Sequence, residues 1–121
     1  MPKRILIVDD EQEARDNLGN FLSRHIECEI RKSSNGRDAL EILDKENFDL
    51  MVLDIKMAGI SGIDVLKAAR ANYPSVKVLI ISAWDSQSVA AEALEVGAID
   101  YITKPASMDV VFQAVKKILS V

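Results

Sequence analysis

Short apolar runs alternate along the chain with segments of helical spacing. There are five such runs, all too short for helices, at residues 4–8, 29–33, 49–53, 76–82 and 98–103. Three of them contain the nearly continuous apolar stretches ILIV, LMVL and VKVLII. This pattern is typical of strands that are covered on both faces, as in a parallel sheet.

The intervening segments place apolar residues three and four positions apart. That spacing predicts amphipathic helices over residues 11–24, 36–46, 61–72, 85–96 and 107–120. Asn35, Ser61, Asp85 and Ser107 stand where a side chain can cap a helix N-terminus, and Gly97 stands where the fourth helix should stop.

The strand–helix alternation runs through the whole chain without a linker, repeat or low-complexity segment. It predicts one α/β domain over residues 1–121, with a doubly wound, flavodoxin-like sheet of five parallel strands and five helices on two faces. Because crossover connections are right-handed, the compact solution has the strand order 2-1-3-4-5.

Composition narrows the class of protein further. Hydrophobic residues make up 49% of the chain and charged residues 28%, the balance of a soluble globular domain. A net charge of −4 argues against a general nucleic-acid-binding surface. Cys28 is the only cysteine, and neither a membrane-spanning apolar run nor a signal-peptide pattern is present, so a cytoplasmic protein is expected. The acids between Glu41 and Glu46 are expected on a solvated helix face.

Polar residues stand where the predicted strands end. The first strand ends in Asp9-Asp10, the third in Asp54, the fourth in Ser82 and the fifth in Lys104, whereas the second, an edge strand, offers nothing comparable. In doubly wound sheets the functional crevice lies outside these carboxyl ends, beside the first and third strands. We therefore expect three carboxylates, one hydroxyl and one amine to converge there.

Such a cluster needs cations. Neighbouring carboxylates repel one another, and the single charge of Lys104 is not enough for three of them. Carboxylates with water and a backbone carbonyl are typical ligands of Mg²⁺ (or Mn²⁺), which leaves coordination positions open for a phosphoryl oxygen. The residues thus predict phosphoryl chemistry, with one carboxylate as nucleophile and with Lys104 and Ser82 binding phosphoryl oxygens.

Four motifs carry a family resemblance that covers essentially the whole chain. They are ILIVDDE, VLDIKMAGISG, VLIISAW and GAIDYITKP. Together they resemble the response-regulator receiver domain, the phosphorylation switch of two-component signalling, including its chemotaxis-regulator type. One departure is Ala58, where the family often has proline, which leaves the conformation of that loop less restricted.

The resemblance implies a role for each site residue. Asp54 would accept the phosphoryl group. Asp10, Asp54 and the backbone carbonyl of Lys56 would ligate Mg²⁺ directly, and Asp9 would act largely through water. Lys104, whose bond to Pro105 is usually cis in the family, would form an ion pair with the phosphoryl group.

Three further residues have implied or hypothetical roles. Ser82 would turn its hydroxyl toward the phosphoryl group, and Tyr101, at the family's aromatic switch position, would then move inward. Trp84 and Lys56 flank the expected site and could control water access to it. The alternative for Trp84 is simple partial burial against the fourth helix.

The function implied is a signalling switch rather than a conventional enzyme. A sensor histidine kinase or a phosphotransfer protein would donate the phosphoryl group. The surface of the fourth helix, fifth strand and fifth helix would then control a downstream effector, or an output domain beyond residue 121. The domain itself would bind neither nucleic acid nor membrane, as a monomer or as a phosphorylation-dependent homodimer.

Three other functions fit the sequence less well. A nucleotide or flavin module would need a glycine- or hydroxyl-rich phosphate loop after the first strand, where Asp9, Asp10 and Glu11 stand instead. A dehalogenase-type phosphatase would need a second acid two residues after its nucleophile, where Lys56 stands. A degenerate receiver, acting only as a docking module, is disfavoured by the intact set of acids, serine and lysine.

Overall fold

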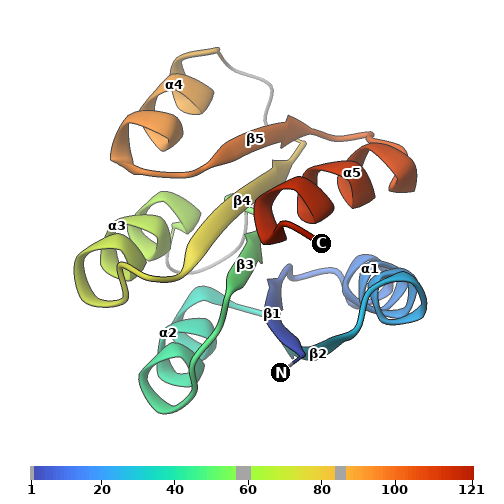
Figure 1. The fold of residues 1–121 in the computed structure, drawn as a ribbon. Coiled ribbons are helices and arrows are strands. Elements are labelled where there is room, and N and C mark those ends of the chain that lie inside the picture. The colour runs from blue at the N-terminus through green and yellow to red at the C-terminus, as the bar shows by residue number, and fades with distance from the viewer. Residues whose placement is uncertain (1, 57–60, 84–86) are drawn as a thin grey trace.

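One parallel sheet organises the molecule. The computed structural model describes residues 2–56, 61–83 and 87–121. Its five strands lie in the order β2-β1-β3-β4-β5, as predicted (Figure 1). The strands are β1 (Lys3–Val8), β2 (Cys28–Ser33), β3 (Leu50–Leu53), β4 (Lys77–Ser82) and β5 (Asp100–Thr103). The helices are α1 (Gln12–His25), α2 (Gly36–Lys45), α3 (Gly62–Asn72), α4 (Gln87–Val96) and α5 (Met108–Leu119).

Local capping fixes several of these helix boundaries. The Asn35 side chain accepts a hydrogen bond from the Asp38 backbone N–H at 2.8 Å. Ser61 and Ser107 cap α3 and α5 in the same way, each at 3.2 Å. Gly97 follows α4 with a φ of 131°, which side-chain-bearing residues rarely adopt, so it ends the helix as predicted. The predicted cap Asp85 lies outside the described residues.

Two hydrophobic cores lie on opposite faces of the sheet. Ile5 and Ile7 of β1 pack in the core that includes α1 and α5, whereas Leu6 and Val8 pack in the core that includes α2, α3 and α4. All four side chains are 1% exposed or less. Because both faces of the strand are buried, its sequence is apolar without alternation.

The predicted solvated face of α2 departs from expectation at its end. Glu46 is only partly exposed, and it pairs with Arg4 at 2.6 Å and with Arg31 at 3.1 Å. Arg4 also pairs with Glu29 at 3.0 Å and lies over the Phe48 ring. This network joins β1, the edge strand β2 and the end of α2.

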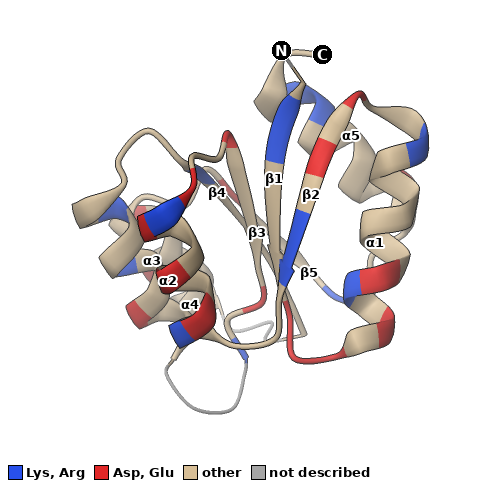
Figure 2. Cartoon of the chain, turned by 90° about the horizontal axis from the view of Figure 1, so that it is seen from below, with Lys and Arg blue, Asp and Glu red and all other residues tan. Residues whose placement is uncertain are grey.

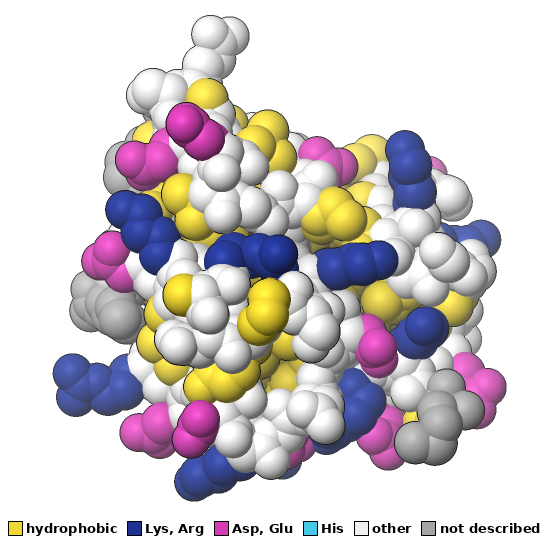
Figure 3. All heavy atoms as spheres, turned by 60° about the vertical axis from the view of Figure 1, so that its left-hand side comes forward, with side chains coloured by type: hydrophobic (Ala, Val, Ile, Leu, Met, Phe, Trp, Pro, Cys, Tyr) yellow, Lys and Arg dark blue, Asp and Glu magenta, His cyan; other side chains and the backbone are white. Residues whose placement is uncertain are grey.

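The surface on the side of α2, α3 and α4 is mixed in character. Positive and negative side chains alternate there with apolar atoms (Figure 3). Large apolar side chains with about half their surface exposed include Leu94 on α4, Ile99 before β5 and Val110 on α5. In the part of the chain that the structure describes, no helix has the length and apolar character needed to cross a membrane.

Candidate functional site

Backbone hydrogen bonds place three predicted site residues at one edge of the sheet. The N–H of Asp9 donates to the carbonyl of Ser33 at 3.1 Å, and that of Asp54 donates to Val8 at 3.0 Å. The N–H of Lys104 donates to the carbonyl of Ser82 at 2.8 Å. Each residue therefore extends the hydrogen-bond ladder one step beyond the carboxyl end of its strand, and Figure 2 shows acidic segments after β1 and β3 at the same end of the sheet.

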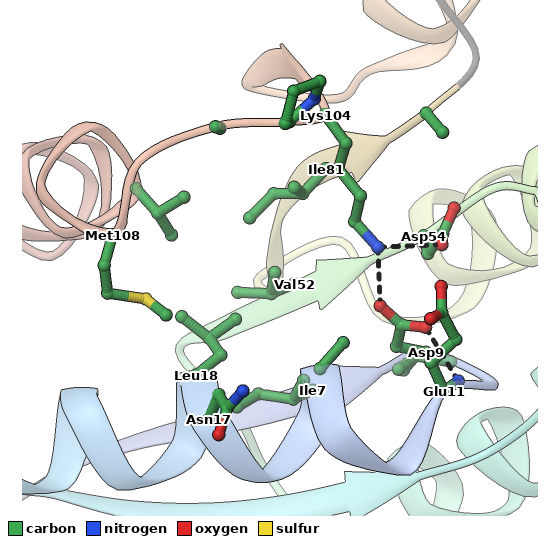
Figure 4. A pocket seen from close by; sticks show the side chains of 16 residues that line it. Ile7, Asp9, Glu11, Asn17, Leu18, Val52, Asp54, Ile81, Lys104 and Met108 are labelled. Carbon is green, nitrogen blue, oxygen red and sulfur yellow. Dashed lines mark hydrogen bonds and ion pairs between the residues drawn. The ribbon is translucent and has the colours of Figure 1, made fainter.

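Lys104 joins the carboxylates of two strands. Its Nζ lies 2.9 Å from Oδ2 of Asp9 and 3.3 Å from Oδ2 of Asp54 (Figure 4). Both aspartates are buried, at 7% and 6% exposed. Burial lowers the pKa of Lys104, but the hydrogen bond to Asp9 and the charges of both aspartates outweigh it, so the pKa is raised above its ordinary value. The amine therefore stays a cation at neutral pH.

The remaining carboxylate oxygens accept backbone N–H groups from the following turns. Oδ1 of Asp9 accepts the N–H of Glu11 at 3.0 Å, and Oδ1 of Asp54 accepts the N–H of Lys56 at 2.9 Å. These turns fix the rotamers of both acids before any ligand arrives.

Sequence reasoning missed one contact of this site. Arg15 on α1 donates from Nη1 to the backbone carbonyl of Asp9 at 2.7 Å, which ties the first turn of the helix to the end of β1. The only signal available was its position six residues after Asp9 on the predicted helix, and this spacing alone does not indicate a contact with a carbonyl.

The acidic residues fit a divalent cation. Asp9, Asp10 and Asp54 each present a carboxylate oxygen, and these oxygens all lie within 4.8 Å of one another. Asp10 is exposed, unlike the other two, so the cluster has one side open to solvent. Carboxylate oxygens are the ligands that Mg²⁺ prefers. The three carboxylates carry more negative charge than the single amine of Lys104 can neutralise, so a divalent cation fits here.

The other predicted site residues lie around this cluster. Ser82 ends β4 and is fully buried, opposite Thr103 in the sheet register. Tyr101 on β5 is half-buried and packs against the core on the α2–α3–α4 side. The Lys56 side chain is exposed, and Trp84 lies outside the described residues, so access control by these two residues stays a prediction. The Lys104–Pro105 peptide is cis, which confirms that expectation.

A cleft of about 500 Å³ opens beside the Lys104–Asp9 pair, between α1 and α5 (Figure 4). Its floor is formed by Ile7, Val52 and Ile81 on the α1–α5 face of the sheet. Asp9, Asp54 and Lys104 therefore belong to the acidic site and also line this apolar cleft.

The fold and this site define a phosphorylation-dependent signalling domain. The chain matches the response regulator receiver domain over residues 5–116, and it belongs to that family. Receiver domains of two-component systems interact with histidine kinases and output domains, and they bind Mg²⁺ at an acidic site.

Individual relatives show how much of longer proteins the chain spans. It is 34% identical to sporulation initiation phosphotransferase F of Bacillus subtilis over 98% of this chain and 95% of that protein. It is 36% identical to the transcriptional regulatory protein ZraR of Escherichia coli over 96% of this chain, but this is only 26% of ZraR. The chain therefore spans nearly all of one relative and about a quarter of another.

Solved structures agree with the fold. The response regulator protein TrrA of Thermotoga maritima, solved in complex with Mg²⁺ and a beryllium fluoride, superimposes with a TM-score of 0.86. The two chains are 34% identical over 96% of this chain and 98% of that one.

Proposed function

We propose that this domain accepts a phosphoryl group onto Asp54 from a sensor histidine kinase or phosphotransfer protein, and that the phosphorylated form controls a downstream effector or an attached output domain. The observation that supports this most is the bridging of Asp9 and Asp54 by Lys104, at 2.9 Å and 3.3 Å. This contact supports the proposal because the proposed nucleophile, Asp54, shares one cation with a second carboxylate, Asp9.

Transfer would be a displacement at phosphorus. A carboxylate oxygen of Asp54 forms the new P–O bond while the bond from phosphorus to the donor breaks, and the electron pair leaves with the donor's imidazole nitrogen. Lys104 donates from Nζ to a phosphoryl oxygen and so stabilises its negative charge. The buried hydroxyl of Ser82 supplies a second donor.

The acids around Asp54 would hold the metal. Asp10, Asp54 and the backbone carbonyl of Lys56 are the proposed direct ligands of Mg²⁺ (or Mn²⁺), with Asp9 acting largely through water. When bound, the ion would supply neutralisation of the negative charge on the transferring group.

The readout would use the surface of α4, β5 and α5. Turning of Ser82 toward the phosphoryl group vacates space, and the half-buried Tyr101 moves into it. Leu94, Ile99 and Val110, about half exposed, give this surface apolar contacts for a partner or a second copy. Phosphorylation shifts the balance between two arrangements of this surface rather than creating a new one.

Mass spectrometry tests the proposal. Incubation with acetyl phosphate and Mg²⁺ should add one phosphoryl group to the wild-type chain and none to Asp54→Asn. Chelation of the metal should suppress the wild-type adduct, because the acidic cluster then lacks its neutralising charge.

Matched controls separate chemistry from folding. Asp64→Asn alters an exposed acid in the first turn of α3 and should leave the adduct unchanged. An adduct that persists in Asp54→Asn would overturn the assignment of the phosphoacceptor. A wild-type chain that takes up no phosphoryl group would instead favour a domain that acts by docking alone.

A further inference from the structure

The cleft between α1 and α5 has an apolar interior that the proposed phosphotransfer does not use. The two helices contact each other through Phe112 on α5 and Phe21 and His25 on α1, with ring centroids 5.6 and 5.4 Å apart. Small residues, Ala14 on α1 and Ala106 before α5, also line the cleft. The helices therefore cover this face of the sheet without filling the space between them.

The lining of the cleft is mainly apolar, and the cleft is open to solvent on one side. The floor residues Ile7 and Val52 are only 1% and 3% exposed, so they belong to the buried face of the sheet. Met108 extends from α5 toward Leu18 of α1 across it (Figure 4). Water is held poorly against such a lining, because the apolar side chains offer it few hydrogen-bond partners. An apolar molecule would displace that water at little cost.

The charges around the cleft select against ionic ligands. The charged residues of the lining are Lys104, the Asp9 and Asp54 carboxylates already paired with it, and Glu11. Asn17 is the neutral polar side chain that lines the cleft. An anion would meet three carboxylates against one amine. A cation would be drawn to the open acidic cluster rather than to the apolar floor, where burial of a charge is costly.

We propose that this cleft is a binding site for a small, uncharged and mainly apolar molecule, and that its occupancy slows phosphorylation of Asp54. The volume of about 500 Å³ lies within the range of ligand sites. The occupant would pack against the stem of Lys104 and exclude water from the Lys104–Asp9 pair, which strengthens their attraction. Lys104 would then stay on Asp9 and be less available to a phosphoryl group. This second part rests on the proposed function.

Indole is a suitable probe, since it is uncharged, aromatic and small. In an amide-detected NMR titration of the full chain, we expect saturable shifts at Leu18, Lys104 and Met108. Intermolecular nuclear Overhauser effects should connect indole protons with the methyl groups of Ile7 and Val52. The anion indole-3-acetate and the cation tryptamine should each bind the cleft at least about tenfold more weakly than indole. Tenfold corresponds to about 1.4 kcal/mol of binding free energy.

Two alanine variants give a matched pair. Ala14→Leu fills the cleft and should weaken indole binding by about tenfold or more, whereas Ala68→Leu on α3, also half-buried, should bind as wild type does. Circular dichroism checks that both variants fold. If Ala14→Leu does not fold, the Overhauser contacts measured in the wild-type chain still show where indole binds.

Several outcomes would overturn the binding site. These are shifts scattered over the surface, equal binding by the charged analogues, and unchanged binding by a folded Ala14→Leu. If the chemical shifts of the cleft residues change with protein concentration in the absence of indole, a second copy of the chain is the occupant. That result also contradicts the proposal.

The link to phosphorylation is tested separately. Saturating indole should slow the acetyl phosphate reaction at least about twofold in wild type and Ala68→Leu, but not in Ala14→Leu. An unchanged rate with the cleft saturated would overturn the link to Lys104. A chain that forms no adduct even without indole would contradict the proposed function, while the binding result would stand by itself.

Discussion

Lys104 acts as an internal counter-ion for two buried acids. Asp9 and Asp54 are less than a tenth exposed, and the lysine amine is the one cation within ion-pair distance of either carboxylate among the described residues. The amine is therefore important for stability as well as for the proposed chemistry, because an unpaired buried carboxylate is costly.

Removal of this amine should destabilise the metal-free protein. We expect Lys104→Met to lower the free energy of unfolding by about 1–3 kcal/mol in the presence of a chelator, because two buried carboxylates lose their partner. Added Mg²⁺ should raise the melting temperature more in this variant than in wild type, since the ion then neutralises acids that have no other cation.

Urea and thermal denaturation with and without Mg²⁺ measure both effects. Lys117→Met, which alters an exposed lysine on α5, serves as the control. A Lys104→Met protein that is as stable as wild type in chelator would show that the ion pairs contribute little.

The sequence was sufficient to predict the acids and the lysine but not their local bonding. Asp9, Asp54 and Lys104 follow directly from the rule that parallel strands end at one edge of the sheet. The bond from Arg15 to the Asp9 carbonyl depends on the orientation of α1 and on one long rotamer, and neither leaves a pattern in the chain. The prediction that Glu46 lies on a solvated helix face was wrong for a similar reason, because its ion-pair partners Arg4 and Arg31 lie on other elements.

At the scale of elements, the start of α3 approaches the end of the third strand very closely. A Cβ added to Gly62 would lie 2.1 Å from the backbone Cα of Ile55. The N–H of Gly62 also donates to the Ile55 carbonyl at 3.3 Å. The helix can therefore begin here only with glycine, and it then covers the sheet beside the acidic site.

Two glycine variants should differ sharply in stability. Gly62→Ala forces a backbone shift and should cost more than about 3 kcal/mol. Gly19→Ala, inside α1, crowds only the Lys32 side chain, at 2.9 Å from its Cε, and this flexible group can move, while Ile30 lies at an ordinary contact distance of 3.5 Å. Because alanine is the better helix former, Gly19→Ala should change stability by about 1 kcal/mol or less in either direction. Urea denaturation compares them, and equal losses would contradict this account of the α3 start.

Element boundaries were predicted less well than element order. The fifth apolar run begins at Ala98, but β5 begins at Asp100, because the N–H of Ala98 bonds back to Ala93 at the end of α4. The fourth run begins at Val76, whose N–H closes a turn onto Tyr73 instead of joining the sheet. In both cases a neighbouring turn takes the hydrogen bond, and hydrophobicity does not reveal that competition.

At the scale of the whole molecule, the two cores share the same strands. β1 contributes Ile5 and Ile7 to one core and Leu6 and Val8 to the other. Loss of either core would expose one face of a sheet that is apolar on both sides. The alternation of strands and helices predicted this arrangement, whereas the open space between α1 and α5 depends on side-chain packing that the pattern does not encode.

The domain should therefore unfold in a single transition. Leu22→Ala on α1 and Leu66→Ala on α3 each truncate a leucine with no exposed surface, one in each core. Each should cost about 2–5 kcal/mol. In both variants, the unfolding transitions followed by far-ultraviolet and by near-ultraviolet circular dichroism should have the same midpoint. Separate midpoints in either variant would show that the cores unfold independently.

The edge strand β2 has a consequence for behaviour at high concentration. An edge strand offers unpaired backbone groups to any other strand, and this is a common route to aggregation. Here Glu29, Arg31 and Lys32 of β2 are exposed, and each forms an ion pair with a residue outside β2. A second strand that docked along β2 would have to pack beside these charges. The sheet is thus protected against growth by strand addition on this side, and the protein should remain dispersed where an apolar edge would form fibrils.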